Sequence, residues 1–307
     1  MERRQIGKLE VSLAGLGCNN FGWRIDRKGT QTVVDAALDA GINFLDTADM
    51  YDNGVSEKYL ADALGNRRND VVLATKFGFS MGEGKSGASP AYVREALEAS
   101  LRRLKTDRID LYQIHTPDPA TPIADTLDAL GQLVKTGKVR EIGCSNFTAE
   151  QLQEAAAAVK DGAPRLVSVQ NEYSLFHRDP EADVLPECKR QGMAFIPYFP
   201  LANGLLTGKY RKGQPLPPNS RGKDAWGPGV FTDHNLDIVE SLIGFASSRG
   251  HSLLELAVSW LAAQAPVASV IAGAKTPEQV RANAAAVGWQ LTKDELSRID
   301  VIVLQAA

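Results

Sequence analysis

The sequence predicts an α/β fold, a single-domain (β/α)8 TIM barrel, from two patterns and from its length. Short apolar runs rich in β-branched residues alternate with longer segments of helical periodicity almost to the end of the chain. Most of the runs lack polar–apolar alternation, which is typical of strands buried on both faces of a parallel sheet. The length of 307 residues suits such a barrel, and no change in composition divides residues 1–307 into domains. A doubly wound sheet is the alternative.

Eight apolar runs are predicted to be the strands: Leu13–Gly17, Ile42–Asp46, Val71–Lys76, Ile109–His115, Glu141–Ser145, Leu166–Glu172, Ala194–Tyr198 and Val267–Gly273. Helix-start signals lie between them. Thr30 precedes an apolar stripe that Gly41 ends, and Ser89-Pro90 combines a cap with a proline at the first helical position. Four pairs have the spacing of a capping box: Thr148 with Gln151, Ser252 with Glu255, Thr276 with Gln279, and Thr292 with Glu295.

The composition argues against several classes of protein. Lys and Arg number 34 and Asp and Glu 37, so the formal net charge is −3, which gives no overall attraction to nucleic acid or to an anionic membrane. The three cysteines are far apart and lack the spacing of metal ligands, so we expect neither a metal site nor a disulfide framework. The first residues lack an apolar secretion signal, and no run is long enough to span a membrane. We therefore expect a cytoplasmic protein.

Two glycine-containing stretches call for different interpretations. Gly208 to Asp233 is irregular and proline-rich, and its length favours a lid or binding loop over an idle connection. Gly82 to Gly87 matches the dinucleotide motif GxGxxG as a string, and it also imitates the end of a phosphate-binding loop. The next helix is expected only after Ser89-Pro90, so no helix N-terminus would face a phosphate there. We interpret residues 82–87 as a flexible loop.

Polar residues close most of the predicted strands. A barrel builds its active site at the carboxyl ends of its strands, where this chain has Asp46, Lys76 and His115, with Tyr51 in the loop after Asp46. A nearby ammonium lowers the pKa of a tyrosine, a carboxylate keeps a desolvated lysine charged, and a histidine can hydrogen-bond a reacting oxygen. Each residue alone has a structural explanation. Together the four form an acid–base set, and we predict them to be catalytic.

Seven motifs in order make the sequence resemble the aldo-keto reductases over nearly the whole chain. They are NFLDTADMY at 43–51, LATK at 73–76, DLYQIH at 110–115, IGCSNF at 142–147, VQNEY at 169–173, PLANGLLTGKY at 200–210 and GAKTPEQ at 273–279. The resemblance implies a barrel that binds NADP(H) in an extended form without a GxGxxG loop. It also implies hydride transfer between nicotinamide C4 and a carbonyl or alcohol carbon.

The resemblance further implies roles for individual residues. Tyr51 would donate the proton, Lys76 and Asp46 would tune the acidity of Tyr51, and His115 would orient the substrate carbonyl. The implied cofactor contacts are Cys18, Asn19, Asp46, Ser145, Asn146, Gln170, Tyr198, Phe199, Pro200, Leu201, Ala202, Gly204, Lys209, Arg221, Gly273, Lys275, Gln279 and Asn283. Among them, Ser145, Asn146 and Gln170 would hold the carboxamide, Tyr198 would stack on the nicotinamide, and the segment from Pro200 with Lys209 and Arg221 would bind the pyrophosphate. Lys275, Gln279 and Asn283 would surround the 2′-phosphate and adenine.

Three positions depart from the pattern of many members. Cys18-Asn19 stands where these have Thr-Trp or Thr-Tyr, Phe199 replaces a serine beside Tyr198, and Ala282 replaces a glutamate near the adenine.

We therefore predict an NADP(H)-dependent oxidoreductase that reduces aldehyde or ketone carbonyls to alcohols, with Tyr51 as general acid. Trp23, Tyr51, His115 and Trp226 are expected to line the pocket for a small-molecule substrate. The alternative is a nucleotide-sensing regulatory subunit similar to channel β-subunits, with little turnover. The irregular stretch at about 208–233, which contains Arg221, is expected to cover the cofactor.

Overall fold

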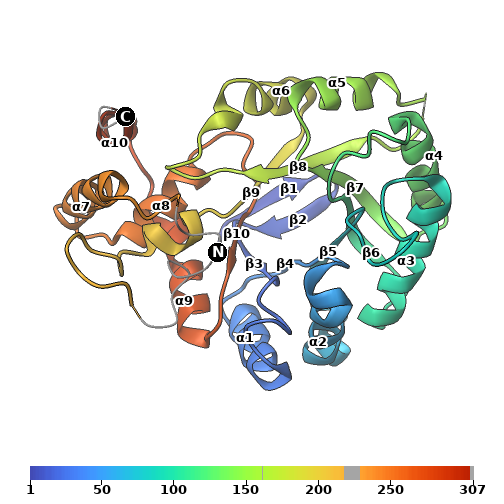
Figure 1. Cartoon of the computed structure of the whole chain (residues 1–307), viewed down its shortest axis with the longest axis horizontal. Coiled ribbons are helices and arrows are strands. Elements are labelled where there is room, and N and C mark those ends of the chain that lie inside the picture. Colours follow the sequence, from blue (N-terminus) through green and yellow to red (C-terminus); the bar gives the residue numbers. More distant parts are fainter. Residues whose placement is uncertain (161, 218–228, 305–307) are drawn as a thin grey trace.

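A computed structural model describes residues 1–160, 162–217 and 229–304. Within these ranges, eight parallel strands form one sheet in the order β10-β3-β4-β5-β6-β7-β8-β9, with helices outside it (Figure 1). The strands are β3 (Ala14–Gly17), β4 (Phe44–Asp46), β5 (Val72–Phe77), β6 (Ile109–Ile114), β7 (Val139–Ser145), β8 (Leu166–Glu172), β9 (Ala194–Tyr198) and β10 (Val270–Gly273). A bridge between Phe195 and Val267 joins β9 to the segment before β10 and closes the barrel. The predicted single-domain (β/α)8 barrel is confirmed.

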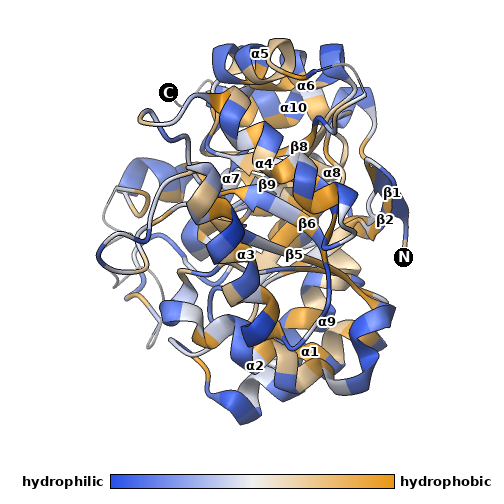
Figure 2. Cartoon of the chain, turned by 90° about the vertical axis from the view of Figure 1, so that its right-hand side faces the viewer, coloured by the Kyte–Doolittle hydropathy of each residue, from blue (hydrophilic) through white to orange (hydrophobic). Residues whose placement is uncertain are grey.

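Ten helices of the described chain surround the strands. They are α1 (Arg27–Asp39), α2 (Val55–Leu64), α3 (Pro90–Leu104), α4 (Ile123–Lys135), α5 (Ala149–Ala157), α6 (Val184–Gln191), α7 (Asp233–Ser247), α8 (Leu253–Ala262), α9 (Pro277–Ala285) and α10 (Lys293–Leu304). Hydrophilic residues colour the outer turns of peripheral helices such as α2 and α5 (Figure 2). No helix in the described ranges is long and apolar enough to cross a membrane.

Most predicted helix starts are found at the expected residues. Ser89 caps α3, and complete capping boxes join Thr148 with Gln151 and Ser252 with Glu255. Thr292 and Glu295 make the same reciprocal bonds at the start of α10.

Two expected helix starts were wrong in detail. Helix α1 begins three residues before Thr30, because the carboxylate of Asp26 accepts the Gly29 N–H at 2.8 Å and Thr30 is buried inside the helix. At α9, Thr276 caps the helix, but the Gln279 side chain accepts from the backbone of Lys275 at 2.7 Å and so does not complete the box.

An antiparallel hairpin, which the sequence reading missed, precedes the barrel. It pairs β1 (Arg3–Ile6) with β2 (Leu9–Ser12) around Gly7, whose φ is +58°. Ile6, Leu9 and Val11 are buried against residues near the amino ends of the barrel strands, among them Phe44 and Val72. The hairpin therefore covers the amino end of the barrel, and the carboxyl end is left for a site.

Candidate active site

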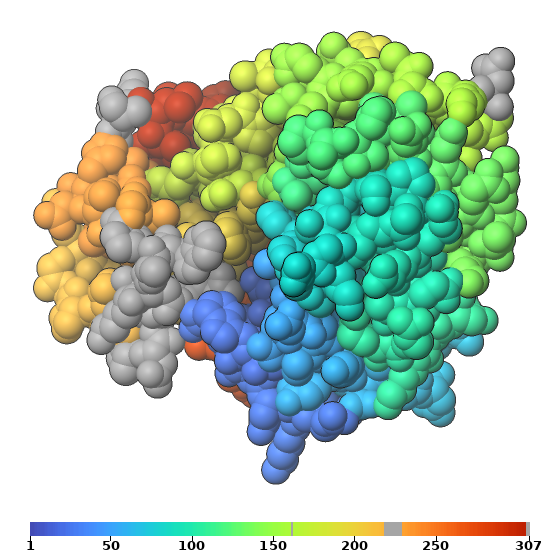
Figure 3. All heavy atoms as spheres, turned by 45° about the vertical axis from the view of Figure 1, so that its right-hand side comes forward, coloured from blue at the N-terminus to red at the C-terminus, as the bar shows by residue number. Residues whose placement is uncertain are grey.

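The carboxyl ends of the strands surround one cavity of about 560 Å³. Asp46 is the last residue of β4, Ser145 of β7, Tyr198 of β9 and Gly273 of β10, and His115 directly follows β6. The predicted residues that line the cavity are Cys18, Asn19, Asp46, Tyr51, His115, Ser145, Asn146, Gln170, Tyr198, Phe199, Pro200, Leu201, Gly204, Lys209, Gly273, Lys275, Gln279 and Asn283. The molecular surface is hollowed where the blue, teal and gold segments meet (Figure 3).

Some predicted site residues do not line the cavity. Lys76 is fully buried behind Tyr51, and Ala202 packs into the hydrophobic core. Trp23 was expected in the substrate pocket, but its ring is 57% exposed and lies under the guanidinium of Arg24 at 4.1 Å, outside the cavity lining. Arg221 and Trp226 lie outside the residues that the structure describes.

Lys76 joins two of the other predicted catalytic residues, Asp46 and Tyr51, into one hydrogen-bonded unit. Its Nζ donates to Asp46 Oδ2 at 2.5 Å and to the Thr47 carbonyl at 2.9 Å, and it lies 3.5 Å from the Tyr51 hydroxyl. The side chains of Lys76 and Asp46 are 0% and 3% exposed. The register of the sheet explains their proximity, because Asp46 pairs with Ala74, two residues before Lys76 on β5.

The charges of this unit act on one another in a dry environment. Burial alone would lower the pKa of Lys76, but the neighbouring Asp46 and Tyr51 more than offset burial and raise it, so the ammonium stays charged. Burial raises the pKa of Tyr51 above its usual value, although Lys76 acts in the opposite direction. The expected lowering of the Tyr51 pKa by Lys76 is therefore present, yet burial outweighs it.

His115 lies between two aromatic rings at the cavity wall. Its ring is edge-on to Tyr51 at 5.9 Å and to Phe79 at 4.6 Å between centroids. Burial, assisted by Lys76, lowers the pKa of His115 well below its usual value, so the imidazole is neutral at neutral pH. Its Nδ1 is buried and has no hydrogen-bond partner within the described protein. A buried polar atom without a partner is costly, and its persistence here points to a functional role for His115.

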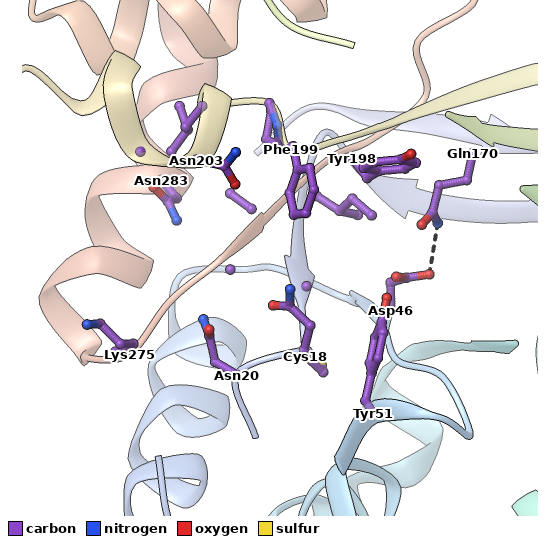
Figure 4. Close-up of a pocket in the computed structure, with 18 of the residues that line it drawn as sticks. Cys18, Asn20, Asp46, Tyr51, Gln170, Tyr198, Phe199, Asn203, Lys275 and Asn283 are labelled. Carbon is purple, nitrogen blue, oxygen red and sulfur yellow. Dashed lines mark hydrogen bonds between the residues drawn. The ribbon is translucent and has the colours of Figure 1, made fainter. Parts of the chain in front are cut away.

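Amide side chains fill the wall between Asp46 and the far strands. Gln113 and Gln170 both donate to Asp46 Oδ1, at 3.1 and 3.0 Å, and Figure 4 shows the Gln170 bond. Asn146 adopts a left-handed φ of +62°, donates to the His115 carbonyl at 2.9 Å and accepts from the Tyr198 hydroxyl at 2.9 Å. This end of the cavity therefore offers amide groups already oriented by bonds to their neighbours.

The other end of the cavity is cationic and polar. Lys275, Asn20, Asn203 and Asn283 lie on the side away from Tyr51 (Figure 4). Among the residues that the structure describes, two basic side chains line the cavity, those of Lys209 and Lys275. Lys275 stands two residues before the first residue of α9, whose first-turn N–H groups favour an anion.

The sequence reading missed several lining residues. They are Gly17, Met50, Phe79, Thr207, Leu254, Ile271 and Ala272. Met50 and Phe79 are 38% and 36% exposed, and each lies in the loop that carries or follows a catalytic residue. That loop position was the only signal in the sequence, because single exposed apolar residues are common on protein surfaces.

The chain as a whole is similar to known proteins. The sequence profile of the aldo/keto reductase family matches residues 14–303. The chain belongs to the aldo/keto reductase family. It is 36% identical to the uncharacterized oxidoreductase YqkF of Bacillus subtilis, over 97% of this chain and 95% of the relative. It is also 34% identical to a probable voltage-gated potassium channel subunit beta of Oryza sativa subsp. japonica, over 99% of this chain and 97% of that relative.

Two solved structures of aldo/keto reductases or related dehydrogenases share the fold. A glycerol dehydrogenase from Gluconobacter oxydans superposes with a TM-score of 0.87 at 31% identity and covers 99% of this chain and 96% of its own. An aldo-keto reductase from Bacillus halodurans in its holo form has a TM-score of 0.81 at 34% identity, with coverage of 98% and 96%. Because aldo/keto reductases use nicotinamide cofactors and act on small molecules, this chain is an oxidoreductase enzyme.

Proposed function

We propose that this aldo/keto reductase uses NADP(H) to reduce aldehyde or ketone carbonyls to alcohols, with Tyr51 as the general acid. The observation that carries the proposal is the buried unit of Asp46, Lys76 and Tyr51 at the cavity wall. Tyr51 presents a phenol to the cavity, and the ammonium behind it is in place to stabilise the phenolate that forms when the proton leaves.

The chain's own residues account for the proton transfer. Tyr51 Oη gives its proton to the carbonyl oxygen, and Lys76, kept charged by Asp46, holds the resulting phenolate. His115 is neutral and lines the cavity beside Tyr51, so it can hydrogen-bond the same carbonyl oxygen without adding a charge. When bound, the nicotinamide supplies the hydride that reaches the carbonyl carbon.

The cavity suits the cofactor at both of its ends. Ser145, Asn146 and Gln170 would hold the carboxamide, and Tyr198 would stack on the nicotinamide ring. Lys275 and the start of α9 would bind the 2′-phosphate that distinguishes NADP from NAD. Further lining residues would complete the contacts along the cofactor, namely Cys18, Asn19, Phe199, Pro200, Leu201, Gly204, Lys209, Gly273, Gln279 and Asn283.

The described part of the irregular stretch supports a role in covering the cofactor. Lys209, at its beginning, lines the cavity. Helix α7 begins at Asp233, where the stretch was expected to end. Residues 218–228, with Arg221 and Trp226, lie outside the described ranges.

The substrate side of the cavity is uncharged and largely apolar. Met50 and Phe79 line it beside Tyr51 and His115, and Phe79 contacts the His115 ring. An aromatic group next to the reacting carbonyl can pack against these side chains, and a flat apolar aldehyde is therefore the appropriate first substrate.

The test is to follow the fall in NADPH absorbance after benzaldehyde is added to the protein. We expect turnover at a rate typical of enzymes, about 1–10³ per second. The similarity to the potassium channel subunit favours the alternative of a regulatory subunit. Tight NADPH binding without oxidation by any of a panel of aldehydes and ketones would support that alternative and contradict the proposed reaction.

A further inference from the structure

A buried ion pair outside the cavity holds the two segments that carry Tyr51 and Lys76. Glu57, in the first turn of α2, has a side chain that is 0% exposed. Arg103, near the end of α3, donates from Nε to Glu57 Oε2 at 2.5 Å and is 18% exposed. Neither residue lines the cavity, so the proposed reaction by itself gives no reason for burying them.

Glu57 is bonded directly to the strand of Lys76. Its other carboxylate oxygen, Oε1, accepts from the Thr75 hydroxyl at 2.7 Å, and Thr75 immediately precedes Lys76 on β5. A short, charge-assisted bond to a buried carboxylate holds this part of β5 against α2. Glu57 therefore restrains the residue next to the proposed catalytic ammonium.

Arg103 packs against the turn that carries Tyr51. After Tyr51, Asp52 and Asn53 have left-handed φ values of +47° and +54°, and Gly54 follows at +81°. A Cβ on Gly54 would lie 2.6 Å from Arg103 Cδ and 2.7 Å from Nε, so the arginine stem occupies the space that a side chain would need. Left-handed conformations of non-glycine residues are costly, and surrounding contacts must maintain them.

We propose that the Glu57–Arg103 pair is a positioning device that holds Tyr51 at the correct distance from Lys76 for proton transfer. The pair touches the Tyr51 turn through Arg103 and the Lys76 strand through Glu57, so one ionic contact sets the relative position of both. The inference rests on the proposed function, because it assigns Tyr51 and Lys76 to the proton-transfer step.

The experiment compares Arg103→Met with a control variant in which a second buried ion pair is broken in the same way. Arg103→Met keeps most of the aliphatic stem and removes the charge, which releases Glu57. The control is Arg68→Met, because Arg68 pairs with buried Asp110 at 2.8 Å, and their side chains are 12% and 1% exposed. Arg68 precedes the amino end of β5, whereas Thr75 and Lys76 lie near its carboxyl end. Both variants should lower the melting temperature.

The expected result is a loss of kcat in Arg103→Met alone. A misplacement of about 1 Å at a reacting group can cost on the order of a hundredfold in rate, and we expect kcat for benzaldehyde to fall roughly ten- to hundredfold. The dissociation constant for NADPH should change less than twofold, as should kcat of Arg68→Met. Arg103→Lys restores a cation and should recover part of kcat. If Arg103→Met does not fold, kcat of Glu57→Gln is compared with that of Arg68→Met instead, and the same loss is expected.

Two outcomes would overturn the positioning role. One is a near-native kcat in Arg103→Met or Glu57→Gln despite lost stability. The other is an equal fall in kcat for Arg68→Met. Either leaves the proposed function intact, because the wild-type protein would still reduce benzaldehyde. A wild-type protein that binds NADPH but reduces no carbonyl would contradict the proposed function itself, and with it the positioning of a proton donor.

Discussion

Strand β5 has a buried ion pair near each end, and the two pairs differ in the polar groups that lie beside them. At the amino end, Asp110 accepts from the Leu73 N–H at 2.9 Å and pairs with Arg68 and Arg140, each at 2.8 Å. Toward the carboxyl end, Lys76 pairs with Asp46, and beside them Gln113 Oε1 and His115 Nδ1 are buried without a partner in the described protein.

The difference indicates which pair maintains the fold and which serves a reaction. A buried charge is tolerated when its hydrogen-bonding capacity is filled, as it is for both Asp110 and Asp46. Beside Asp46, in contrast, Gln113 and His115 have unfilled capacity, which costs stability and in a native protein calls for a functional explanation. The contrast thus assigns stability to the amino end of β5 and chemistry to its carboxyl end.

The largest expected effect is that of Lys76→Met at the carboxyl end. It removes the cation beside Tyr51 and leaves Asp46 buried without its ion-pair partner, so it should stop turnover and lower the free energy of unfolding by about 3–5 kcal/mol. Urea denaturation and the NADPH assay measure the two effects. An inactive variant of wild-type stability would contradict the burial of the Lys76–Asp46 pair as the structure shows it.

Tyr51→Phe should separate chemistry from stability at the same end. It deletes the proton donor and keeps the ring, so we expect kcat to fall by roughly 10²–10⁴, with the melting temperature and the NADPH affinity nearly unchanged. Steady-state rates and a fluorescence titration give these quantities. Retention of near-native kcat would remove Tyr51 from its proposed role.

Lys275→Ala tests the end of the cavity away from Tyr51. A charged hydrogen bond contributes about 1.5–3 kcal/mol, so NADPH binding should weaken on the order of ten- to hundredfold. NADH lacks the 2′-phosphate, and its binding should barely change. Fluorescence titration of both cofactors decides the question, because equal losses for NADPH and NADH would exclude Lys275 from the 2′-phosphate site.

The smallest expected effect concerns Asp49, which is 1% exposed and interacts electrostatically with Lys76 and with the Glu57–Arg103 pair. Burial, followed by the charge of Glu57, raises its pKa to about 7, whereas Arg103 and Lys76 act in the opposite direction. The charge of Asp49 in turn helps to raise the pKa of Tyr92, in α3, and of Tyr112, in β6. The folded protein therefore keeps a proton that the unfolded chain releases, and stability should fall as pH rises from about 4 to about 7.

Asp49→Asn should remove this slope. The wild type should lose on the order of 2 kcal/mol more than the variant between pH 5 and pH 8, measured by urea denaturation at both values. Glu295→Gln, at the exposed start of α10, serves as a control for the general titration of carboxylates. A parallel pH dependence in wild type and Asp49→Asn would show that Asp49 is ionised in the fold throughout this range.

The fold was largely predictable because its signals are local. The predicted bounds of β8 and β9 coincide with those of the structure, since continuous apolar runs mark doubly buried strands. Caps at Ser89, Thr148 and Ser252 were found because a cap depends on three neighbouring residues. The hairpin β1–β2 was missed, although Leu9 and Val11 alternate with Glu10, because each of its strands has only four residues.

The site was predictable in its composition but not in its geometry. Strand ends and motifs identified Asp46, Tyr51 and His115, which do line the cavity. They also placed Trp23 in the pocket, yet its ring lies outside the cavity against Arg24. Phe79 is the opposite case. It lines the cavity but was not predicted, because nothing in the local sequence indicates that its ring contacts His115.

The sequence by itself determined the barrel, the order of its strands and the residues available at their carboxyl ends, because periodicity, caps and motifs involve residues close together in the chain. Only the tertiary structure decided that Lys76 is buried behind Tyr51 and that Arg103 reaches Glu57. Such contacts depend on the register between neighbouring strands and on how α2 and α3 pack, and a pattern along one segment contains neither. Burial also decided the pKa directions of Tyr51 and His115, since desolvation is a property of the packed interior.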